Sequence, residues 1–481
     1  RRTPALSCDR HLPSEVKVSS MIRLFGHYVS PALLGLLGLE SSLSFGSFVL
    51  GPALWRAWSG GGADPDWVAI LPKALAGTLV LIAILIALGL YERRFWRGRA
   101  DMLLRAGLGF LFGLFALAVL GWLVPALALG RGESSLAFGF AGAAVLALRF
   151  GFLRATGRAA FARRVLVVGV GAQAARLERL RPDETWGCRI VGYVQVQEDE
   201  PAGVPPERRL QVTNRLVDLA AGLHIDEIVV ALDDQRGGFP LDEMLECKLA
   251  GIRIGPLLAF AERETGRIAL EALRPSNILF ADGFPALFDR QPLKRGLDVA
   301  VSLLLLALAS PILLLAALAI GLECGFREPI LYRQVRVGQR DRPFTILKFR
   351  TMRADAGGGL TKPGDPRITR VGRLLRETRI DELPQLANVL RGEMSLVGPR
   401  PEQPQYVTQL RAAIPFYELR HLGQPGLTGW AQICYPYADS EQSSREKLQY
   451  DLYYLKNASV GFDLLILLQT VHAVLWGGGA R

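Results

Sequence analysis

The sequence is poor in the residues that build metal centres and disulfide frameworks. Its 481 residues include five cysteines, and no two of them form a CxxC pair. A zinc or redox centre of that type is therefore excluded, and a disulfide framework is not expected. The five histidines show no HExxH spacing, which argues against a zinc hydrolase. Aromatic residues, 51 glycines and 28 prolines are spread along the chain, which excludes a disordered chain and a coiled coil.

Apolar residues and positive charge, in contrast, are abundant. Half of the residues are hydrophobic and 21% are charged, and the mean hydropathy is +0.24, whereas soluble proteins of this length usually lie below zero. The net charge of +11 indicates anionic partners such as lipid headgroups, nucleic acid or phosphorylated substrates. We therefore expect a membrane protein with basic cytosolic parts, divided into roughly two to four domains.

The apolar excess is concentrated in the first third of the chain. Four stretches there approach the ~20 residues that a helix needs to cross the hydrocarbon core of a bilayer. They are 31–54, 67–91, 106–129 and 136–152. Glu40 and Lys73 interrupt the first two, and we expect such side chains to face neighbouring helices. The sequence predicts a bundle of four transmembrane helices over 21–155, after a polar leader at 1–20 that precedes Met21.

The distribution of arginines predicts the orientation of these helices. The link at 92–99 holds four arginines, and the segment 154–164 after the fourth stretch holds four more. The other two links, 59–66 and 130–135, are short and poor in positive charge. Because cytosolic loops carry an excess of basic residues, we expect both termini in the cytosol.

A fifth apolar run, 299–322, lies in the C-terminal half. Its 24 residues are enough to span a bilayer, but Ser310 and Pro311 interrupt its centre. Proline removes a backbone donor and clashes with the preceding turn, so the helix should kink or break there. Basic residues flank both ends, so a full crossing would place one basic cluster outside, against the positive-inside rule. A re-entrant helix that breaks at Ser310-Pro311 and returns satisfies both observations; an ordinary kinked span is the alternative.

Residues 160–282 alternate predicted strands with helices, which is typical of a parallel sheet. The buried-strand run 165–168 is followed by Gly-Val-Gly-Ala-Gln-Ala at 169–174. A Gly-x-Gly-x-x-Ala turn can hold a phosphate at a helix N-terminus. The acidic residue expected at the end of the second strand is missing, because Gln195 and Gln197 occupy that area. The sequence thus predicts a Rossmann-like α/β domain that is either a structural relic or regulatory domain, or a working dinucleotide site.

The C-terminal third carries the features that indicate phosphate chemistry. From Arg290 to Arg353 there are eleven basic residues against four acidic ones. They fit either a surface held against anionic lipid or groups that bind a diphosphate. Asp381 and Glu382 lie between arginines and an apolar helix predicted at 386–390. A carboxylate pair can bind Mg²⁺, and one member can act as a nucleophile.

A rigid turn, Ser395 to Pro401, presents Arg400 between Pro399 and Pro401. A fixed arginine can grip a phosphate through two parallel hydrogen bonds. The turn and the carboxylate pair are together compatible with an enzyme that acts on phosphates.

Five separate motifs occur in an order that resembles one known family. They are Lys294-Arg295-Gly296-Leu297-Asp298, the Ser310-Pro311 break, Asp381-Glu382-Leu383-Pro384-Gln385, Ser395 to Pro401, and Pro425 to Gln432. The stretch from Lys294 onward resembles the catalytic module of the bacterial polyprenyl-phosphate sugar-1-phosphate transferases, and four spans followed by an α/β domain resemble its long-form members. The resemblance implies an α-rich catalytic domain at 289–481. One departure is Gln424, where relatives often carry Lys or Arg before the Pro-Gly.

The resemblance implies transfer of a sugar-1-phosphate from a UDP-sugar to undecaprenyl phosphate, with release of UMP. Asp381 is the implied nucleophile, forming an aspartyl-phosphosugar intermediate, and Glu382 is its implied catalytic partner. Both carboxylates would bind the implied cofactor, Mg²⁺. Arg400, with Pro399, would grip the nucleotide or sugar phosphate. The product would start exopolysaccharide or O-antigen repeat-unit synthesis at the bacterial inner membrane, with the catalytic domain on its cytosolic face.

The remaining candidates divide into basic and aromatic residues. The basic residues expected to bind substrate or lipid headgroups are Lys294, Arg295, Arg336, Lys348, Arg350, Arg376 and Arg379. Lys294 and Arg295 suit the depth of the lipid headgroups, and a purely structural surface is left open for Arg336, Lys348 and Arg350. The aromatic residues expected at the membrane interface are Trp430, Tyr435, Tyr437, Tyr453 and Tyr454.

Three alternatives fit parts of the same sequence. Membrane-bound nucleotide-sugar dehydratases combine four spans with α/β domains, but none of the eleven tyrosines has a lysine four residues later, as their Tyr-x-x-x-Lys pair requires. A glycosyltransferase that moves only the sugar would release UDP. A membrane-anchored scaffold of a polysaccharide export system would use the middle domain to sense a nucleotide. A homodimer is a further expectation from the family's architecture, and no nucleic acid partner is expected.

Overall fold

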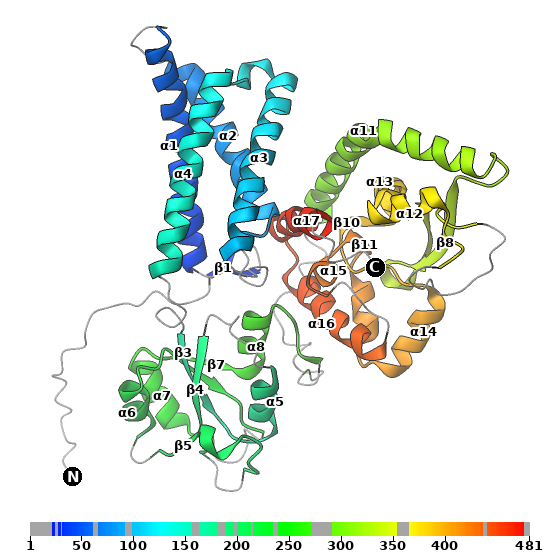
Figure 1. Ribbon diagram of the computed structural model, residues 1–481. Coiled ribbons are helices and arrows are strands. Elements are labelled where there is room, and N and C mark those ends of the chain that lie inside the picture. The colour runs from blue at the N-terminus through cyan, green and yellow to red at the C-terminus, as the bar shows by residue number, and fades with distance from the viewer. Residues whose placement is uncertain are drawn as a thin grey trace, which may run out of the picture.

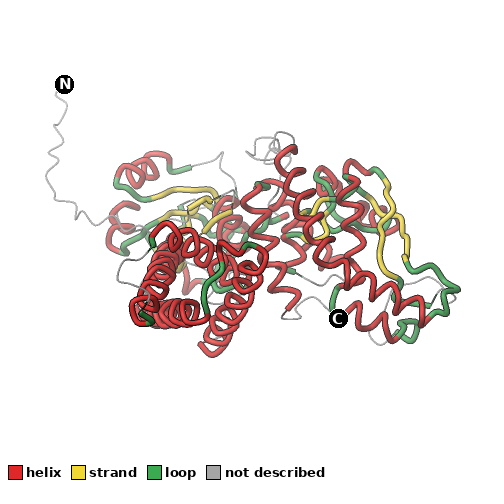
Figure 2. The backbone as a smooth tube through the Cα atoms, turned by 90° about the horizontal axis from the view of Figure 1, so that it is seen from above, coloured by secondary structure: helices red, strands yellow, loops and turns green. Residues whose placement is uncertain are grey.

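The computed structural model has three parts: a helical bundle, a sheet domain below it and a mixed module beside both (Figure 1). Seen from above, the bundle and the C-terminal module lie side by side (Figure 2). Helix α17 (Val460–Leu475) of the module packs against α2 (Trp67–Ala87) of the bundle. The structure describes residues 22–24, 27–29, 31–60, 66–91, 99–155, 163–180, 188–196, 200–212, 215–233, 239–270, 273, 291–353, 365–435 and 440–475.

Four long helices form the N-terminal bundle. They follow a hairpin of β1 (Ile22–Leu24) and β2 (His27–Val29), and they are α1 (Pro31–Trp58), α2, α3 (Arg99–Leu123) and α4 (Arg131–Ala155). Each contains a segment long and apolar enough to cross a membrane. They lie where the four spans are expected. Helices α3 and α4 start before the predicted 106 and 136, because a helix continues through polar residues that a hydropathy pattern leaves out.

A buried ion pair fastens α1 to α4. Arg149 Nε lies 2.7 Å from Glu40 Oε1, and a second guanidinium nitrogen donates to Oε2 at 2.7 Å. Both residues are at most 1% exposed, so the expectation that Glu40 faces a neighbouring helix is confirmed. The same two helices touch at Gly51, where a Cβ would lie 2.6 Å from Ala137 N; glycine is required by this close approach.

The middle domain is built on a five-stranded parallel sheet of order β5-β4-β3-β6-β7, as the alternating pattern predicts. Along β3, Val165 and Val167 face one core while Leu166 and Val168 face the other. Helices α5 and α8 cover the first face, and α6 and α7 cover the second. The elements are β3 (Arg163–Val168), α5 (Ala172–Leu180), β4 (Cys188–Val194), β5 (Arg209–Leu210), α6 (Leu216–Gly222), β6 (Glu227–Val230), α7 (Leu241–Leu249), β7 (Arg253–Pro256) and α8 (Leu257–Thr265).

The C-terminal module is rich in helix and contains two small sheets. Strands β8 and β9 form an antiparallel hairpin, and β10 pairs with β11 in parallel. The elements are α11 (Gln291–Glu323), β8 (Leu331–Val337), β9 (Pro343–Phe349), α12 (Arg370–Glu377), the 3-10 helix η6 (Ile380–Gln385), α13 (Leu386–Arg391), β10 (Ser395–Val397), α14 (Pro404–Ala413), the 3-10 helix η7 (Tyr417–Leu422), β11 (Gly426–Thr428), α15 (Trp430–Cys434), α16 (Glu441–Asn457) and α17.

Helix α11 bends without breaking. It remains one helix through Pro311, and Figure 1 shows it bent near its middle. In an unbroken helix the amide of residue 311 would donate to the carbonyl of residue 307, and proline has no such amide. The Ser310 hydroxyl donates to Ala307 O instead, at 2.8 Å. Of the kink or break predicted at Ser310-Pro311, a break is wrong, because the helix continues and the serine satisfies the carbonyl that the proline leaves open.

The expectation that Trp430, Tyr453 and Tyr454 form a membrane-interface surface is wrong. They are 1%, 0% and 3% exposed, and they belong to the main core of the C-terminal module. Their rings pack around Phe462 of α17, at centroid distances of 5.1–6.1 Å. Of the other two aromatic residues expected there, Tyr435 is half-buried and Tyr437 lies outside the described residues.

The same core includes the end of the middle domain. Ile268 and Leu270, which follow α8, pack within it, and the Trp430 indole donates to Gly266 O at 2.9 Å. Lys456 of α16 adds an ion pair of 2.6 Å to Glu262 of α8. The segment after α8 therefore belongs to the core of the C-terminal module, while the sheet of the middle domain keeps its own two cores.

Candidate active site

The acidic pair lies on the short helix η6, between α12 and α13. Asp381 and Glu382 occupy its first turn, and the residue before the helix is Arg379, whose φ of 58° and ψ of 14° are left-handed. A non-glycine residue in that conformation costs roughly 1–2 kcal/mol, so the surrounding packing must hold the turn in place. Helix η6 packs on β9, the strand that carries Lys348.

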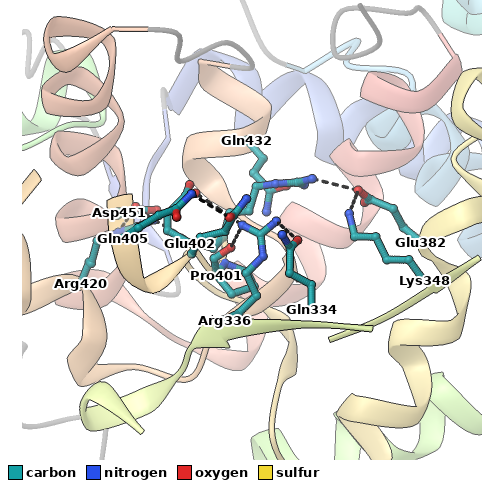
Figure 3. Close-up of polar contacts among 12 residues, drawn as sticks. Gln334, Arg336, Lys348, Glu382, Pro401, Glu402, Gln405, Arg420, Gln432 and Asp451 are labelled. Carbon is teal, nitrogen blue, oxygen red and sulfur yellow. Dashed lines mark hydrogen bonds and ion pairs between the residues drawn. The ribbon is translucent and has the colours of Figure 1, made fainter. Parts of the chain in front are cut away.

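Three cations converge on one oxygen of Glu382. Lys348 Nζ lies 3.0 Å from Glu382 Oε1 (Figure 3). An Arg400 nitrogen lies 2.8 Å from the same oxygen, and Arg379 lies 3.9 Å from it. Burial alone would raise the pKa of Glu382, but Arg400 and Lys348 outweigh it and hold that pKa well below its usual range. Glu382 is therefore a fixed anion that aligns the basic side chains around it.

Asp381, the neighbouring carboxylate, has different surroundings from Glu382. It is 8% exposed, and it accepts no hydrogen bond and forms no ion pair with any residue that the structure describes. Burial raises the pKa of Asp381, the charge of Glu382 adds to this, and Lys348, Arg376 and Arg379 oppose it. Asp381 thus has the uncommitted oxygens that a nucleophilic carboxylate requires.

The turn that carries Arg400 is fixed through its backbone. The carbonyls of four successive residues each accept a hydrogen bond, one from β11, one from η7 and two from β8. These bonds are Gly426 N to Pro399 O at 2.9 Å, Arg420 to Arg400 O at 3.0 Å, Arg336 to Pro401 O at 3.2 Å, and Val337 N to Glu402 O at 2.9 Å. The Arg400 side chain, still 37% exposed, projects from a rigid base, as the predicted Pro-Arg-Pro turn requires.

Arg420 is a residue of this region that the sequence did not indicate. It is 5% exposed and forms an ion pair of 2.9 Å with Asp451, which is 3% exposed. Tyr417 accepts a further hydrogen bond from Arg420 at 3.0 Å. The three residues lie on η7 and α16, and no local pattern connects positions 31 residues apart. Arg420 acts on the site through the carbonyl of Arg400.

The Lys294-Arg295-x-x-Asp298 motif anchors α11 to the rest of the module. Lys294 Nζ donates to Asp463 at 2.8 Å and to Val397 O at 3.1 Å. Arg295 donates to the carbonyls of Val389 and Leu390 at the end of α13. Asp298 accepts from Leu396 N at 3.0 Å. These contacts account for both basic residues within the fold, and their expected contact with lipid headgroups stays a prediction.

The remaining predicted residues lie on both sides of β9. Arg336 is held by the Arg400 turn and by Gln334 at 2.8 Å, and Arg350 donates to Pro329 O at 2.7 Å. Arg376 donates to Thr351 at 2.8 Å. Gln424, the departure from the family pattern, donates to Gly392 O at 3.0 Å and so caps the end of α13.

The backbone next to Lys348 is fixed by hydrogen bonds between Asn388 and the edge of β9. The Asn388 side chain accepts from Leu347 N at 3.0 Å and donates to Thr345 O at 2.8 Å, so it pairs with β9 as another strand would. Burial lowers the pKa of Lys348, while Glu382 opposes that change. This arrangement keeps the amine aimed at the acidic pair.

The acidic pair fits a magnesium ion only when the substrate supplies further ligands. Among the described residues no three His, Cys, Asp or Glu side chains gather into a metal-binding group. Mg²⁺ is commonly bound by one or two carboxylates, with substrate phosphates and waters completing its octahedron. Asp381 and Glu382 are the residues that could hold such an ion, through the oxygens of Asp381 and Oε2 of Glu382, for which the structure shows no hydrogen bond among the described residues.

The Gly-x-Gly-x-x-Ala turn of the middle domain is filled by the chain itself. Glu200 accepts from Val170 N at 3.0 Å and from Gly171 N at 3.1 Å. Asp233 accepts from Ala172 N at 2.7 Å and from Gln173 N at 2.8 Å. Two carboxylates therefore occupy the four amides on which a pyrophosphate would sit in a dinucleotide-binding domain.

Comparison with known proteins agrees with the geometry of the C-terminal module. Residues 289–477 match the profile of a family described as Bacterial sugar transferase. The chain is 39% identical over 270 residues to a UDP-N-acetylgalactosamine-undecaprenyl-phosphate N-acetylgalactosaminephosphotransferase of Aeromonas hydrophila, a match that covers 55% of this chain and 62% of that protein. It is 48% identical over 187 residues to a UDP-glucose:undecaprenyl-phosphate glucose-1-phosphate transferase of Caulobacter vibrioides, covering 38% of this chain and 69% of the relative.

A third relative extends the likeness through the bundle and the middle domain. A UDP-glucose:undecaprenyl-phosphate glucose-1-phosphate transferase of Xanthomonas campestris is 30% identical over 441 residues, which cover 85% of this chain and 88% of that protein. Since the acidic pair and the Arg400 turn lie inside the matched segment, the chain belongs to the bacterial sugar transferase family, the polyprenyl-phosphate sugar-1-phosphate transferases.

Proposed function

We propose that this protein transfers a sugar-1-phosphate from a UDP-sugar to undecaprenyl phosphate through an aspartyl-phosphosugar intermediate, with release of UMP. The observation that carries the proposal is the asymmetry of the acidic pair. Glu382 is engaged by three cations, whereas Asp381 has no partner among the described residues. The relatives named for transfer from UDP-glucose or UDP-N-acetylgalactosamine to undecaprenyl phosphate support the same substrate classes here.

In the first step an Asp381 oxygen attacks the phosphorus that bears the sugar. The bond from this phosphorus to the bridging oxygen breaks, and UMP leaves with the electron pair. Arg400 and Lys348, already aligned by Glu382, lie where they can hold the charge that develops on the phosphate oxygens. When bound by Asp381, Glu382 and the diphosphate, Mg²⁺ supplies additional neutralisation of that charge.

In the second step an oxygen of undecaprenyl phosphate attacks the same phosphorus. The acyl phosphate bond breaks, Asp381 regains its carboxylate, and the polyprenyl-diphosphate-sugar leaves. The product starts exopolysaccharide or O-antigen repeat-unit synthesis. Both phosphorylated substrates meet at one carboxylate, so the site must lie where a cytosolic nucleotide-sugar and a membrane lipid are both within reach.

The attachment of α11 supports a position at the cytosolic face of the inner membrane. Its first turns are bound to α13, β10 and α17, as described above, and its last residue caps α12, because Glu323 accepts from Arg370 N at 2.8 Å. Between these ends the apolar side chains are open, with Leu308 64% and Leu314 72% exposed. A bent helix with both ends on one module supports a re-entrant hairpin in one leaflet, with α1–α4 as four transmembrane helices.

The first test is to identify the released nucleotide. Detergent-solubilised full-length protein is incubated with Mg²⁺, undecaprenyl phosphate and either UDP-glucose or UDP-N-acetylgalactosamine. We expect UMP from at least one donor, and loss of that release on addition of EDTA. Release of UDP would overturn the proposal in favour of simple glycosyl transfer.

The membrane arrangement has its own test. A reporter that is active only in the cytosol, fused after Glu323, should report the cytosol, as should the same reporter placed before Gln291. Activity of only one fusion would make α11 a spanning helix and would contradict the hairpin. Light scattering of the solubilised protein tests the expected homodimer.

A further inference from the structure

Gln432 lies beside Arg400 on the side away from the acidic pair. One terminal nitrogen of Arg400 donates to Gln432 Oε1 at 2.8 Å and the other donates to Glu382 Oε1 at 2.8 Å (Figure 3). The guanidinium is thus held at both tips, by a carboxylate on one side and by a neutral amide on the other. Together with Lys348 the four side chains form a row, Lys348–Glu382–Arg400–Gln432.

The backbone fixes Gln432 in this place. It lies on α15, which begins directly after Gly429. A Cβ at Gly429 would lie 2.2 Å from Gly398 O, so the start of α15 touches the residue that opens the Pro399–Pro401 turn. Any side chain at Gly429 would push α15 and Arg400 apart.

The orientation of the Gln432 amide follows from the chemistry of its partner. A guanidinium has only donors, so the amide must present its oxygen to Arg400 and turn its nitrogen away. Gln432 Nε2 is buried there and has no hydrogen-bond partner among the described residues. A buried amide nitrogen without a partner lowers the stability of the fold, so packing alone would favour an apolar side chain of similar length at this position.

We propose that Gln432 is a positioning residue that orients Arg400 toward the diphosphate of the nucleotide-sugar. The proposal rests on the proposed function, to which it adds a residue that acts through Arg400. Without the amide, the guanidinium keeps Glu382 as its one side-chain anchor among the described residues, and the charge of Arg400 turns toward that carboxylate and away from the substrate. A neutral acceptor is needed because a second carboxylate would neutralise the charge that the diphosphate must meet.

The role predicts opposite effects on stability and on substrate binding. Gln432→Met removes the unpartnered amide, so the melting temperature of the full-length protein should stay the same or rise. Its dissociation constant for UDP and its KM for the UDP-sugar should both rise roughly ten- to hundredfold, the usual effect of losing a hydrogen bond to a charged group. Gln432→Glu keeps the shape but adds a charge, and it should weaken UDP binding more than Gln432→Met does.

A matched control is available on the surface of the same module. Gln409 lies on α14 and is exposed, so Gln409→Met should leave the melting temperature, UDP binding and KM unchanged. UDP binding is measured by calorimetry on solubilised full-length protein, and the released nucleotide is measured in the same preparations.

The outcomes separate this inference from the proposed function. A lower melting temperature in Gln432→Met with unchanged UDP binding would show a structural role and overturn the inference. Gln432→Glu binding UDP better than Gln432→Met would overturn it as well, because shape would then matter more than charge. Release of UDP in place of UMP would overturn the proposed function alone, while the binding comparison would still decide the role of Gln432. A wild-type protein that binds no UDP would contradict both.

Discussion

Two regions of this molecule gather hydrogen-bond donors suited to phosphate, and the chain places its own carboxylates in each. In the middle domain, the amides of residues 170–173 donate to Glu200 and Asp233. In the C-terminal module, Lys348 and Arg400 converge on Glu382. The first arrangement uses all four of these amides, whereas the second leaves basic groups partly exposed and a second carboxylate, Asp381, that pairs with no described residue.

The difference lies in how many bonds each donor can make. A backbone amide has a single N–H, so a carboxylate that accepts it removes it from use. A guanidinium has five N–H groups and an ammonium has three, so Arg400 and Lys348 can hold Glu382 and still bind a phosphate. A carboxylate therefore closes a site made of amides, while it aligns a site made of basic side chains. We expect ligand binding at the second site and not at the first.

The largest effect is expected from Asp381→Asn. The change removes the nucleophile, and an uncharged amide cannot form the acyl phosphate, so UMP release should fall at least about 10³-fold. Because Asp381 pairs with no described residue, the melting temperature and the amount of protein in the membrane should stay unchanged. Asp218→Asn, an exposed position on α6, serves as the control. Full activity of Asp381→Asn would show that Asp381 is not the nucleophile. The difference between the environments of Asp381 and Glu382 would then have no catalytic meaning.

Opening the middle-domain turn should have a smaller effect, on stability. Glu200→Ala leaves two buried amides without an acceptor, which costs about 1–3 kcal/mol. The double variant Glu200→Ala with Asp233→Ala should in addition gain thermal stabilisation by millimolar inorganic phosphate at matched ionic strength. Glu207→Ala, at an exposed position of the same domain, should behave as the wild type.

The same experiment tests the middle domain as a nucleotide sensor. NAD⁺ should not raise the melting temperature of the wild-type protein in a way that depends on Gly171, because the carboxylates of Glu200 and Asp233 occupy the amides of the glycine turn. Binding of NAD⁺ that is lost in Gly171→Ala would mean that Glu200 and Asp233 move aside, and the two regions would then differ less than the geometry indicates.

The smallest effect is expected in the pH dependence. The pKa of Asp381 is raised and the attacking group is the carboxylate, so kcat/KM should fall as pH drops through a value above that of an ordinary aspartate, about 3.9. Lys348 opposes this rise, so Lys348→Met should move the acid limb to higher pH. If the acid limb of the kcat/KM profile lies at the same pH in Lys348→Met as in the wild type, Lys348 acts on Glu382 alone.

The sequence predicted the parts of the fold that depend on local patterns. Hydropathy located the helices that became α1–α4 and α11, and alternation located the parallel strands of the middle domain. The Asp-Glu pair and the Pro-Arg-Pro turn were found as motifs, and the structure brings Glu382 and Arg400 within 2.8 Å. Local patterns were sufficient where the determining contacts lie within one element.

Apart from the break at Ser310-Pro311, what the sequence left open or placed wrongly concerns contacts between distant positions. The glycine turn indicates a phosphate site until Glu200 and Asp233 are seen to fill it, and Asp233 lies 61 residues from Ala172. Trp430 has the composition of a membrane interface, yet its indole is buried against a carbonyl 164 residues away. Lys294 has the charge of a headgroup ligand, a role that stays a prediction, and its partner within the fold is Asp463, 169 residues away. Charge and aromaticity do not specify a partner, and only the tertiary fold does.

The hydrogen bond from Trp430 to Gly266 bears on how hybrid proteins of this kind can be made. A gene fusion joined between the middle domain and residue 289 would exchange Gly266, Ile268 and Leu270 along with the sheet domain. The recipient would then lack both the acceptor for a buried indole and two apolar side chains of its core. A crossover placed at the end of α8, before Gly266, keeps this segment with the core of the C-terminal module and leaves α8 on the sheet face that it covers. The favourable joint for recombination therefore lies at the end of α8 and not near residue 289.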